Sequence, residues 1–222
     1  MLTIISAWNI IYLEMYKAKD VSLDPARAAL NIESAALSQM ADSLEPKSFV
    51  QAVRILAKAP RIGASGCGHS GIACMHFVHL LCCIERPARF LFPSEALHGG
   101  SGFLQAGDAM VLASRGGETA ELIPLIKICE QKKVSVISIT ENLKSPLALG
   151  SDIVLGITVD RETDRDNQQG TTSFIVMCGI FDALQTVLIE ETKYSKERFA
   201  LIHPGGAVGK RLNQNASKTR KA

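Results

Sequence analysis

Residues 109–121 read Ala-Met-Val-Leu-Ala-Ser-Arg-Gly-Gly-Glu-Thr-Ala-Glu, and this stretch decides the fold class. The apolar run from Ala109 to Ala113 is typical of a buried β-strand, and Leu122 to Ile126 has the pattern of an early helical turn. Small and hydroxyl residues between a strand and a helix let backbone N–H groups point at an anion, and the helix dipole favours negative charge there. The stretch therefore predicts an α/β unit with an anion-binding turn.

Two further turns of the same kind occur along the chain. Ser65-Gly66-Cys67-Gly68-His69-Ser70-Gly71 follows a second apolar run, and Thr171-Thr172-Ser173 opens a long helical pattern. Three Ser/Thr-rich turns on one α/β scaffold predict a small ligand that carries a phosphate group.

Apolar segments and helical patterns alternate along most of the chain. We expect strands over residues 61–65, 88–92, 109–114, 134–139 and 153–157. We expect helices over residues 24–44, 49–58, 71–84, 119–131, 145–149 and 171–191, the first with Asp24 as its N-cap. The strands lack polar alternation, which is typical of a parallel sheet buried on both faces. The fold class is therefore α/β: a doubly wound three-layer αβα sandwich with a five-stranded parallel sheet, whose ligand lies beyond the carboxyl ends of the strands.

Length and composition indicate one domain in a cytoplasmic protein. The 222 residues carry a net charge of +2, which gives no reason to expect nucleic acid or an anionic membrane as a partner. The six cysteines lack C-x-x-C spacing, so we expect reduced thiols. We assign residues 1–23 to an N-terminal extension, 24–212 to the domain and 213–222 to a flexible basic tail. Leu2 to Leu13 is too short to span a bilayer and is expected to be a docking helix or a segment without a role in the chemistry.

Four motifs follow one another along the chain: Ser65-Gly66-x-Gly-x-Ser70-Gly71, Glu95-Ala96-Leu97-His98-Gly99, Ser114-x-Gly-Gly-Glu-Thr-x-Glu121 and His203-Pro204-Gly205-Gly206-Ala207. With these motifs, residues 25–212 resemble the sugar isomerase (SIS) domain, and within it the D-arabinose 5-phosphate isomerases. The resemblance implies the SIS fold and an enzyme that interconverts D-arabinose 5-phosphate and D-ribulose 5-phosphate. It also implies a homotetramer with shared active sites. The pair of CBS domains that often follows in this family is not found here, so we expect a single-domain form.

The resemblance implies a set of site residues as well. The expected acid–base residues are Glu95, His98, Glu121, Glu162 and His203. The expected substrate-binding residues are Ser65, Gly68, His69, Ser70, Ser114, Arg115, Gly117, Thr119, Thr171, Thr172 and Ser173. Isomerisation through an enediol needs a base at carbon and groups that move protons between the two oxygens, so we expect neither a cofactor nor a metal. A carboxylate in a closed cleft beside a phosphate dianion is expected to have a raised pKa, which makes glutamate a usable base near neutral pH.

Several of these residues allow a second interpretation. Glu162 stands among charged neighbours, as a solvated loop carboxylate would, and Arg115 fits a solvent-facing turn as well as a phosphate contact. His69 stands where the family has a lysine, and as an imidazolium it would replace that charge. Gly100 stands in place of a family aspartate, and Thr163-Asp164-Arg165 in place of a Cys-Pro stretch.

Two motif matches are set aside, and two functions stay open beside the isomerase. His76 and His79, even with His69, are expected to be core or interface histidines because an apolar helix surrounds them. Gly66-x-Gly68-x-x-Gly71 matches the dinucleotide string, but no acidic residue ends the next strand, so NAD is not expected. The alternative functions are a non-catalytic sensor that binds a phosphosugar and an isomerase of another phosphosugar.

Overall fold

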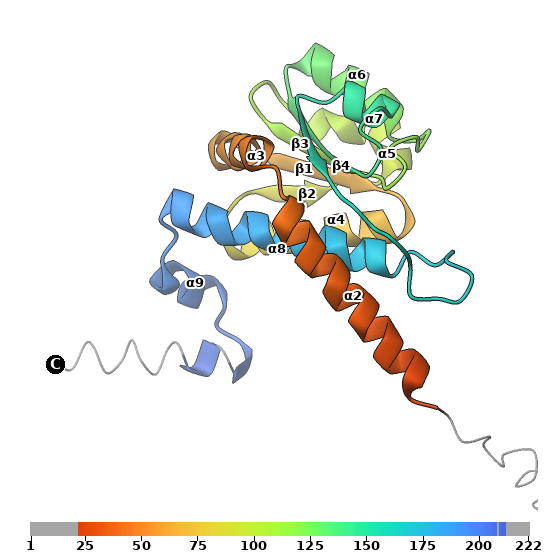
Figure 1. Ribbon diagram of the computed structural model, residues 1–222. Helices are drawn as coiled ribbons and strands as arrows, with labels where there is room; N and C mark the ends of the chain where they lie inside the picture. Colours follow the sequence, from red (N-terminus) through yellow and green to blue (C-terminus); the bar gives the residue numbers. More distant parts are fainter. Residues whose placement is uncertain (1–21, 208, 212–222) are drawn as a thin grey trace, which may run out of the picture.

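The computed structural model describes residues 22–207 and 209–211, and Figure 1 traces the chain through its elements. The segment from Leu2 to Leu13 and the expected tail at 213–222 lie outside these residues. In chain order the elements are α2 (Asp24–Ser43), α3 (Pro46–Lys58), β1 (Ile62–Gly66), α4 (Gly68–Cys83), β2 (Ala88–Phe90), α5 (Pro93–Leu97), the 3₁₀ helix η1 (Gly100–Phe103), β3 (Ala109–Ala113), α6 (Ile123–Lys132), β4 (Ser135–Thr140), α7 (Pro146–Leu149), β5 (Ile153–Gly156), α8 (Thr172–Thr192) and α9 (Lys196–Ile202).

The five strands form one parallel sheet in the order β2-β1-β3-β4-β5, which confirms the expected doubly wound sandwich. Helices α3, α4 and α8 cover one face and α2 packs on α8, while α5, α6 and α7 cover the other face (Figure 1). The chain therefore leaves β1 toward one face and the neighbouring strand β3 toward the other. In sheets of this order, the carboxyl end of that strand pair is the point where ligands bind.

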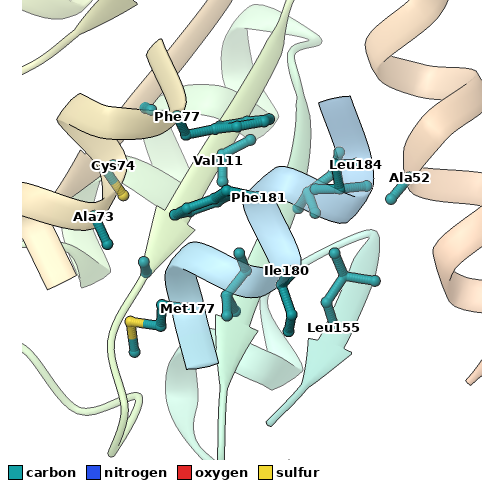
Figure 2. Packing of buried hydrophobic residues seen from close by; sticks show 14 of the residues in the cluster. Ala52, Ala73, Cys74, Phe77, Val111, Leu155, Met177, Ile180, Phe181 and Leu184 are labelled. Carbon is teal, nitrogen blue, oxygen red and sulfur yellow. The ribbon is translucent and has the colours of Figure 1, made fainter. Parts of the chain in front are cut away.

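The central strands are buried on both faces of the sheet. Every residue of β1 and β3 is buried, whereas the edge strands β2 and β5 are partly exposed. On the α8 side, Phe77 stacks on Phe181 with 4.4 Å between the ring centroids, in the same cluster as Val111 of β3 (Figure 2). Burying one such side chain stabilises the fold by about 1.5–3 kcal/mol. Because helices cover both faces, a central strand has no position for a polar side chain that needs water.

The predicted helices need corrections in where they begin and in number. Helix α3 begins at Pro46 rather than at residue 49, and α4 begins at Gly68 rather than at residue 71. The N-cap of α2 is Leu23, and Asp24 is already the first helical residue. The helix expected from Thr119 begins at Ile123, because residues 119–122 form a turn in which the Leu122 N–H donates to the Thr119 carbonyl at 3.0 Å. Helices α5 and α9 have five and seven residues, and such short helices leave no periodic pattern in the sequence.

Helix α8 is long and apolar enough to cross a membrane by length and composition, and no other helix in the described ranges is. It has 21 residues and a mean hydropathy of 1.8 over its most apolar window. Its side chains Val176, Ile180, Phe181 and Leu184 belong to the core against the sheet. A core helix of an α/β sandwich passes the same test, because it packs on a sheet and on neighbouring helices at once.

The start of α4 packs tightly on the end of β1 through two glycines. A Cβ at Gly71 would lie 2.5 Å from the Gly66 carbonyl oxygen, and a Cβ at Gly66 would lie 2.9 Å from the Gly71 nitrogen. Both contacts are with backbone, which cannot rotate away as a side chain does. The residue type at both positions is therefore fixed by the approach of the helix to the strand.

We expect Gly71→Ala to destabilise the protein although it lies in a helix. Helix propensity favours alanine by up to about 1 kcal/mol, but forcing a methyl group into close-packed backbone costs about 1–3 kcal/mol. Urea denaturation should therefore give a lower free energy of unfolding for this variant. The control is Gly102→Ala, whose Cβ would meet nothing within 4 Å and should change stability by less than about 0.5 kcal/mol. Equal stability of the two variants would contradict the close packing.

Candidate active site

The first anion-binding turn lies at the start of α4, directly after β1. Cys67 is the N-cap residue and makes no side-chain hydrogen bond to the helix, and Gly68 has a φ of +54°, which favours glycine. The first N–H groups of a helix have no intrahelical acceptor. Those of Gly68, His69 and Ser70 are therefore available to a ligand, and the helix dipole adds attraction for an anion.

The second turn follows β3 and is held in shape by its own side chains. The hydroxyl oxygens of Ser114 and Thr119 are 2.8 Å apart and hydrogen-bonded, and Ser114 Oγ accepts the Gly117 N–H at 3.1 Å. Gly117 has a φ of +69° and lies against Ser145, so only glycine fits. Gly117 thus serves the turn rather than a ligand. By contrast, the N–H groups of residues 118–121 donate to no acceptor in the described part of the chain.

The third predicted turn, at the start of α8, already holds an anion of the protein itself. Glu162 Oε2 accepts the Ser173 N–H and the Thr171 hydroxyl, each at 3.2 Å. A carboxylate at a helix N-terminus is stabilised by the helix dipole. The Thr172 hydroxyl is fully buried and has no partner among the described residues. The expectation of three open anion sites is therefore corrected to two.

Arg115 also differs from its expected place. Its Nη1 donates to Glu162 Oε1 at 2.6 Å and its Nε to Glu141 Oε2 at 2.8 Å. Its Nη2 donates to the Val159 carbonyl at 3.2 Å. Each nitrogen of the guanidinium has an acceptor within the protein, which holds its plane in place, and the side chain is 35% exposed.

Glu162 is the most deeply buried ionisable group of the site, with 1% of its surface exposed. Burial alone would raise the pKa of this carboxyl, but the hydrogen bonds from Ser173, the Arg115 charge and the Thr171 hydroxyl together hold it below its usual value. Glu162 is therefore not the solvated loop carboxylate that its charged neighbours suggest, and the contacts within the chain lower its pKa. The raised pKa expected beside a phosphate dianion stays a prediction.

Glu121 is a different kind of carboxylate. It is exposed at the end of the second turn and has no hydrogen bond or ion pair with any residue that the structure describes. It lies close enough to Cys67 that, together with burial, its charge raises the pKa of that thiol. The two open turns, one after β1 and one after β3, therefore meet beside a free carboxylate.

The remaining predicted residues near these turns have distinct roles. Ser65 is fully buried and donates its hydroxyl to the Leu91 carbonyl at 2.7 Å, so it lies beneath the first turn. His69 is exposed and its ring lies 6.0 Å from the Phe174 ring, between centroids. Glu95, in the first turn of α5, and His98, the C-cap of α5, are both exposed. They follow β2 and so belong to the same carboxyl edge of the sheet.

His203 lies far from these turns within one chain. It ends α9, which is tied to the segment after α4 by the ion pair from Arg198 Nε to Glu85 Oε2, 2.6 Å long. The first anion-binding turn is at the other end of α4, whose 16 residues make it about 24 Å long. The His203 ring packs on Phe199 and its buried Nδ1 has no partner in residues 22–207 or 209–211. The fold thus brings His203 together with neither Glu121 nor Glu162 of the same chain.

Two of the three histidines of α4 have a polar partner within the protein. His76 Nε2 is 3.0 Å from Asp182 Oδ1, and His79 Nε2 is 3.6 Å from Cys83 Sγ. Across the described ranges, no group of three or more His, Cys, Asp or Glu side chains is placed to hold a metal ion.

Two residues that shape the site are not among those predicted from the sequence. Glu141 follows β4 directly and binds Arg115. Asn167 has a φ of +58° and its Oδ1 accepts the Glu162 N–H at 2.6 Å. The position of Glu141 just after a strand is a usable signal, since polar residues there face the site. No sequence signal indicates the contact between Asn167 and Glu162.

Comparison with known proteins agrees with this architecture. A family model described as "SIS domain" matches residues 55–187. A Haemophilus influenzae protein named "probable arabinose 5-phosphate isomerase" is 37% identical over 188 residues, which are 84% of this chain and 56% of that protein. The arabinose 5-phosphate isomerase KdsD of Pseudomonas aeruginosa is 34% identical over 165 residues, which are 74% of this chain and 51% of KdsD.

A solved structure agrees as well. The Escherichia coli CFT073 protein c3406, in complex with arabinose 5-phosphate, superposes with a TM-score of 0.76 at 26% identity, over 81% of this chain and 95% of that chain. The chain belongs to the SIS domain family. It spans between 51% and 56% of the length of the two curated relatives named above.

We expect Glu162→Gln to destabilise the protein at neutral pH by about 2–3 kcal/mol, because it removes the anion at the start of α8 and one of the two carboxylates that bind Arg115. The folded-state pKa of Glu162 is lowered, so its contribution is complete above the unfolded pKa of about 4.3 and is lost as pH falls through the folded value. Urea denaturation should show a gap between wild type and variant that narrows below about pH 4. The matched control is Glu130→Gln, an exposed carboxylate of α6. A gap that is constant with pH would contradict the assignment.

Proposed function

We propose that the protein is a phosphosugar aldose–ketose isomerase that interconverts D-arabinose 5-phosphate and D-ribulose 5-phosphate through an enediol. The observation that carries the proposal is the meeting, at the β1/β3 end of the sheet, of two turns with available N–H groups and the free carboxylate of Glu121. The turns suit a phosphate and the carboxylate suits proton transfer. The names of the relatives and the arabinose 5-phosphate in the c3406 complex support the choice of substrate.

The phosphate is held, in this proposal, by the first and second turns. Gly68, His69 and Ser70 contribute the N-terminus of α4, and the loop from Ser114 to Thr119 contributes its N–H groups and hydroxyls. Ser65 and Thr172 are fully buried, so they support the site from beneath. Thr171 and Ser173 act on Glu162 rather than on the ligand.

The two glutamates divide the work according to their surroundings. A general base needs an oxygen lone pair that is free to take the proton. Glu162 is held ionised by its partners and is a weak base, whereas Glu121 is free of partners in the described chain and beside the phosphate turns. We therefore assign the carbon-bound proton to Glu121 and electrostatic support of the site to Glu162. Glu95, His98 and His203 are assigned to ring opening and to proton transfer between the two oxygens.

We expect wild-type protein to form ketose from D-arabinose 5-phosphate when a panel of pentose and hexose phosphates is assayed. Glu121→Gln should lower kcat by about 10²–10⁴ with little change in KM, because a general base acts in the transition state. Glu130→Gln, far from the site on α6, is the matched control and should keep wild-type kinetics.

Two results would redirect the proposal. Binding of D-arabinose 5-phosphate by calorimetry, without ketose formed from any sugar in the panel, would identify a phosphosugar sensor. Turnover of hexose phosphates alone would identify an isomerase of another substrate.

A second copy of the chain completes the site in this proposal, in a homotetramer with shared active sites. His203 is remote from Glu121 within one chain, as described above. Helix α2 has 20 residues, of which only Ala36 and Met40 are buried. From the N-cap of α2 onward, the exposed leucines Leu23, Leu30 and Leu37 recur at seven-residue spacing. Helix α4 adds the exposed apolar side chains Ile72 and Met75. An exposed apolar surface of this kind on a soluble domain suits a self-association interface.

We expect two inactive variants to restore each other. His203→Ala and Glu121→Gln, co-expressed with different tags and purified as mixed assemblies, should recover about a quarter of the wild-type sites, since each shared site draws one residue from each of two copies. Each variant alone is the control. Light scattering that shows a monomer at micromolar concentration, or mixed assemblies without recovered activity, would reject the shared site.

We infer a cytoplasmic location and a reaction without a cofactor. All six cysteines are free, and burial raises the pKa of the Cys129 thiol to about 12. Unpaired thiols are typical of proteins in a reducing compartment. Carboxylates and imidazoles supply the proton transfers that the reaction needs.

A further inference from the structure

The geometry points to Arg115 as a positioning residue that, held by Glu141, fixes the Glu162 carboxylate at the start of α8, and not as a ligand of the substrate phosphate. The inference rests on the proposed function only where it concerns the phosphate, since the contacts of Arg115 exist without any ligand.

The donors of Arg115 are distributed over three segments. Nε binds Glu141 at the end of β4, Nη1 binds Glu162 before α8, and Nη2 binds the Val159 carbonyl after β5. A guanidinium presents its N–H groups in a rigid plane, so three contacts of this kind fix its orientation. A lysine ammonium on a flexible stem has no such plane.

Glu141 holds Arg115 through the backbone as well. The Glu141 N–H and the Thr140 hydroxyl both donate to the Arg115 carbonyl, at 2.9 Å and 3.0 Å. The other carboxylate oxygen of Glu141 accepts the Val159 N–H at 3.2 Å. Glu141 thus ties the turn after β3 to the loop after β5, and Arg115 cannot turn toward the phosphate turns without losing both carboxylates.

The charge of the cluster also opposes a phosphate. One guanidinium lies between two carboxylates, so the cluster of Arg115, Glu141 and Glu162 carries a net negative charge. A phosphate dianion placed on Arg115 would face both carboxylates at short range, and like charges repel. The other groups at the Glu162 carboxylate are the Thr171 hydroxyl and the Ser173 N–H, both uncharged. Arg161 donates to the Glu162 backbone carbonyl at 3.3 Å and not to the carboxylate. Removing Arg115 therefore removes the cation that favours the ionised carboxylate.

The test follows the Glu162 carboxyl directly by ¹³C NMR, with protein labelled at the glutamate side-chain carboxyl and the resonance assigned by its loss in Glu162→Gln. Arg115→Gln should move the titration midpoint of Glu162 upward, because burial then acts without the opposing charge. Arg161→Gln removes the same charge one residue away and is the matched control, with a midpoint close to wild type. Arg115→Lys keeps the charge but places it on a flexible stem without the planar fork, so its midpoint should shift upward by less. It replaces Arg115→Gln as the measured variant if the latter does not fold.

Inorganic phosphate, titrated against the amide resonances of the same samples, tests the second half of the inference. Its Kd should change by less than about twofold in Arg115→Gln. An unchanged Glu162 midpoint, or a phosphate Kd raised by about tenfold or more, would overturn the inference. The titration midpoint of Glu162 is measured without turnover. A wild-type protein that converts no phosphosugar would defeat the proposed function. The role of Arg115 would still be decided by the Glu162 midpoint and the phosphate titration.

Discussion

The site depends on the hydrogen bonds and the ion pair that the Glu162 carboxylate accepts at the N-terminus of α8. A buried carboxylate without partners is too costly to keep ionised, so its presence commits the surrounding segments to supply donors. Arg115 comes from the turn after β3, and Thr171 and Ser173 come from the start of α8. These segments lie far apart in the sequence, and all of them contact one buried charge at the same edge of the sheet. The edge is thereby shaped before any ligand arrives.

Two helix N-termini of this molecule differ in whether the protein itself supplies an anion to them. The start of α4 is uncapped by any side chain, and the start of α8 is neutralised from within. A helix N-terminus attracts an anion in either case. A helix N-terminus that already binds a carboxylate of the protein is not available to an external phosphate, whereas one without such a carboxylate is. In the proposed isomerase, the sugar phosphate would therefore bind at the α4 side, and the acidic groups would lie further along the edge.

The sequence predicts the sheet well and the site only in part, for a physical reason. Strands such as Ala109–Ala113 are recognisable because a central strand covered on both faces is mostly apolar, and that requirement is local. The identity of the turns after β1 and β3 is local too, since Gly68 and Gly117 need positive φ angles. The partner of a buried charge is not local. Glu162 has its contacts 47 residues upstream at Arg115 and 11 residues downstream at Ser173, and no spacing rule connects them. The charged neighbours of Glu162 in the sequence even suggest exposure, the opposite of its burial.

The contact between α2 and α8 sets an order on the making of the protein. Leu37 of α2 packs where α8 has Gly179, so a Cβ at Gly179 would lie 2.7 Å from the Leu37 side chain. The ribosome releases α2 before α8, which follows all five strands, so Leu37 of α2 has no α8 to pack on while the sheet is being made. Contacts between such distant segments form late and leave apolar surface open in the meantime. During synthesis, the face of α2 that later packs on α8 is therefore open to a neighbouring nascent chain.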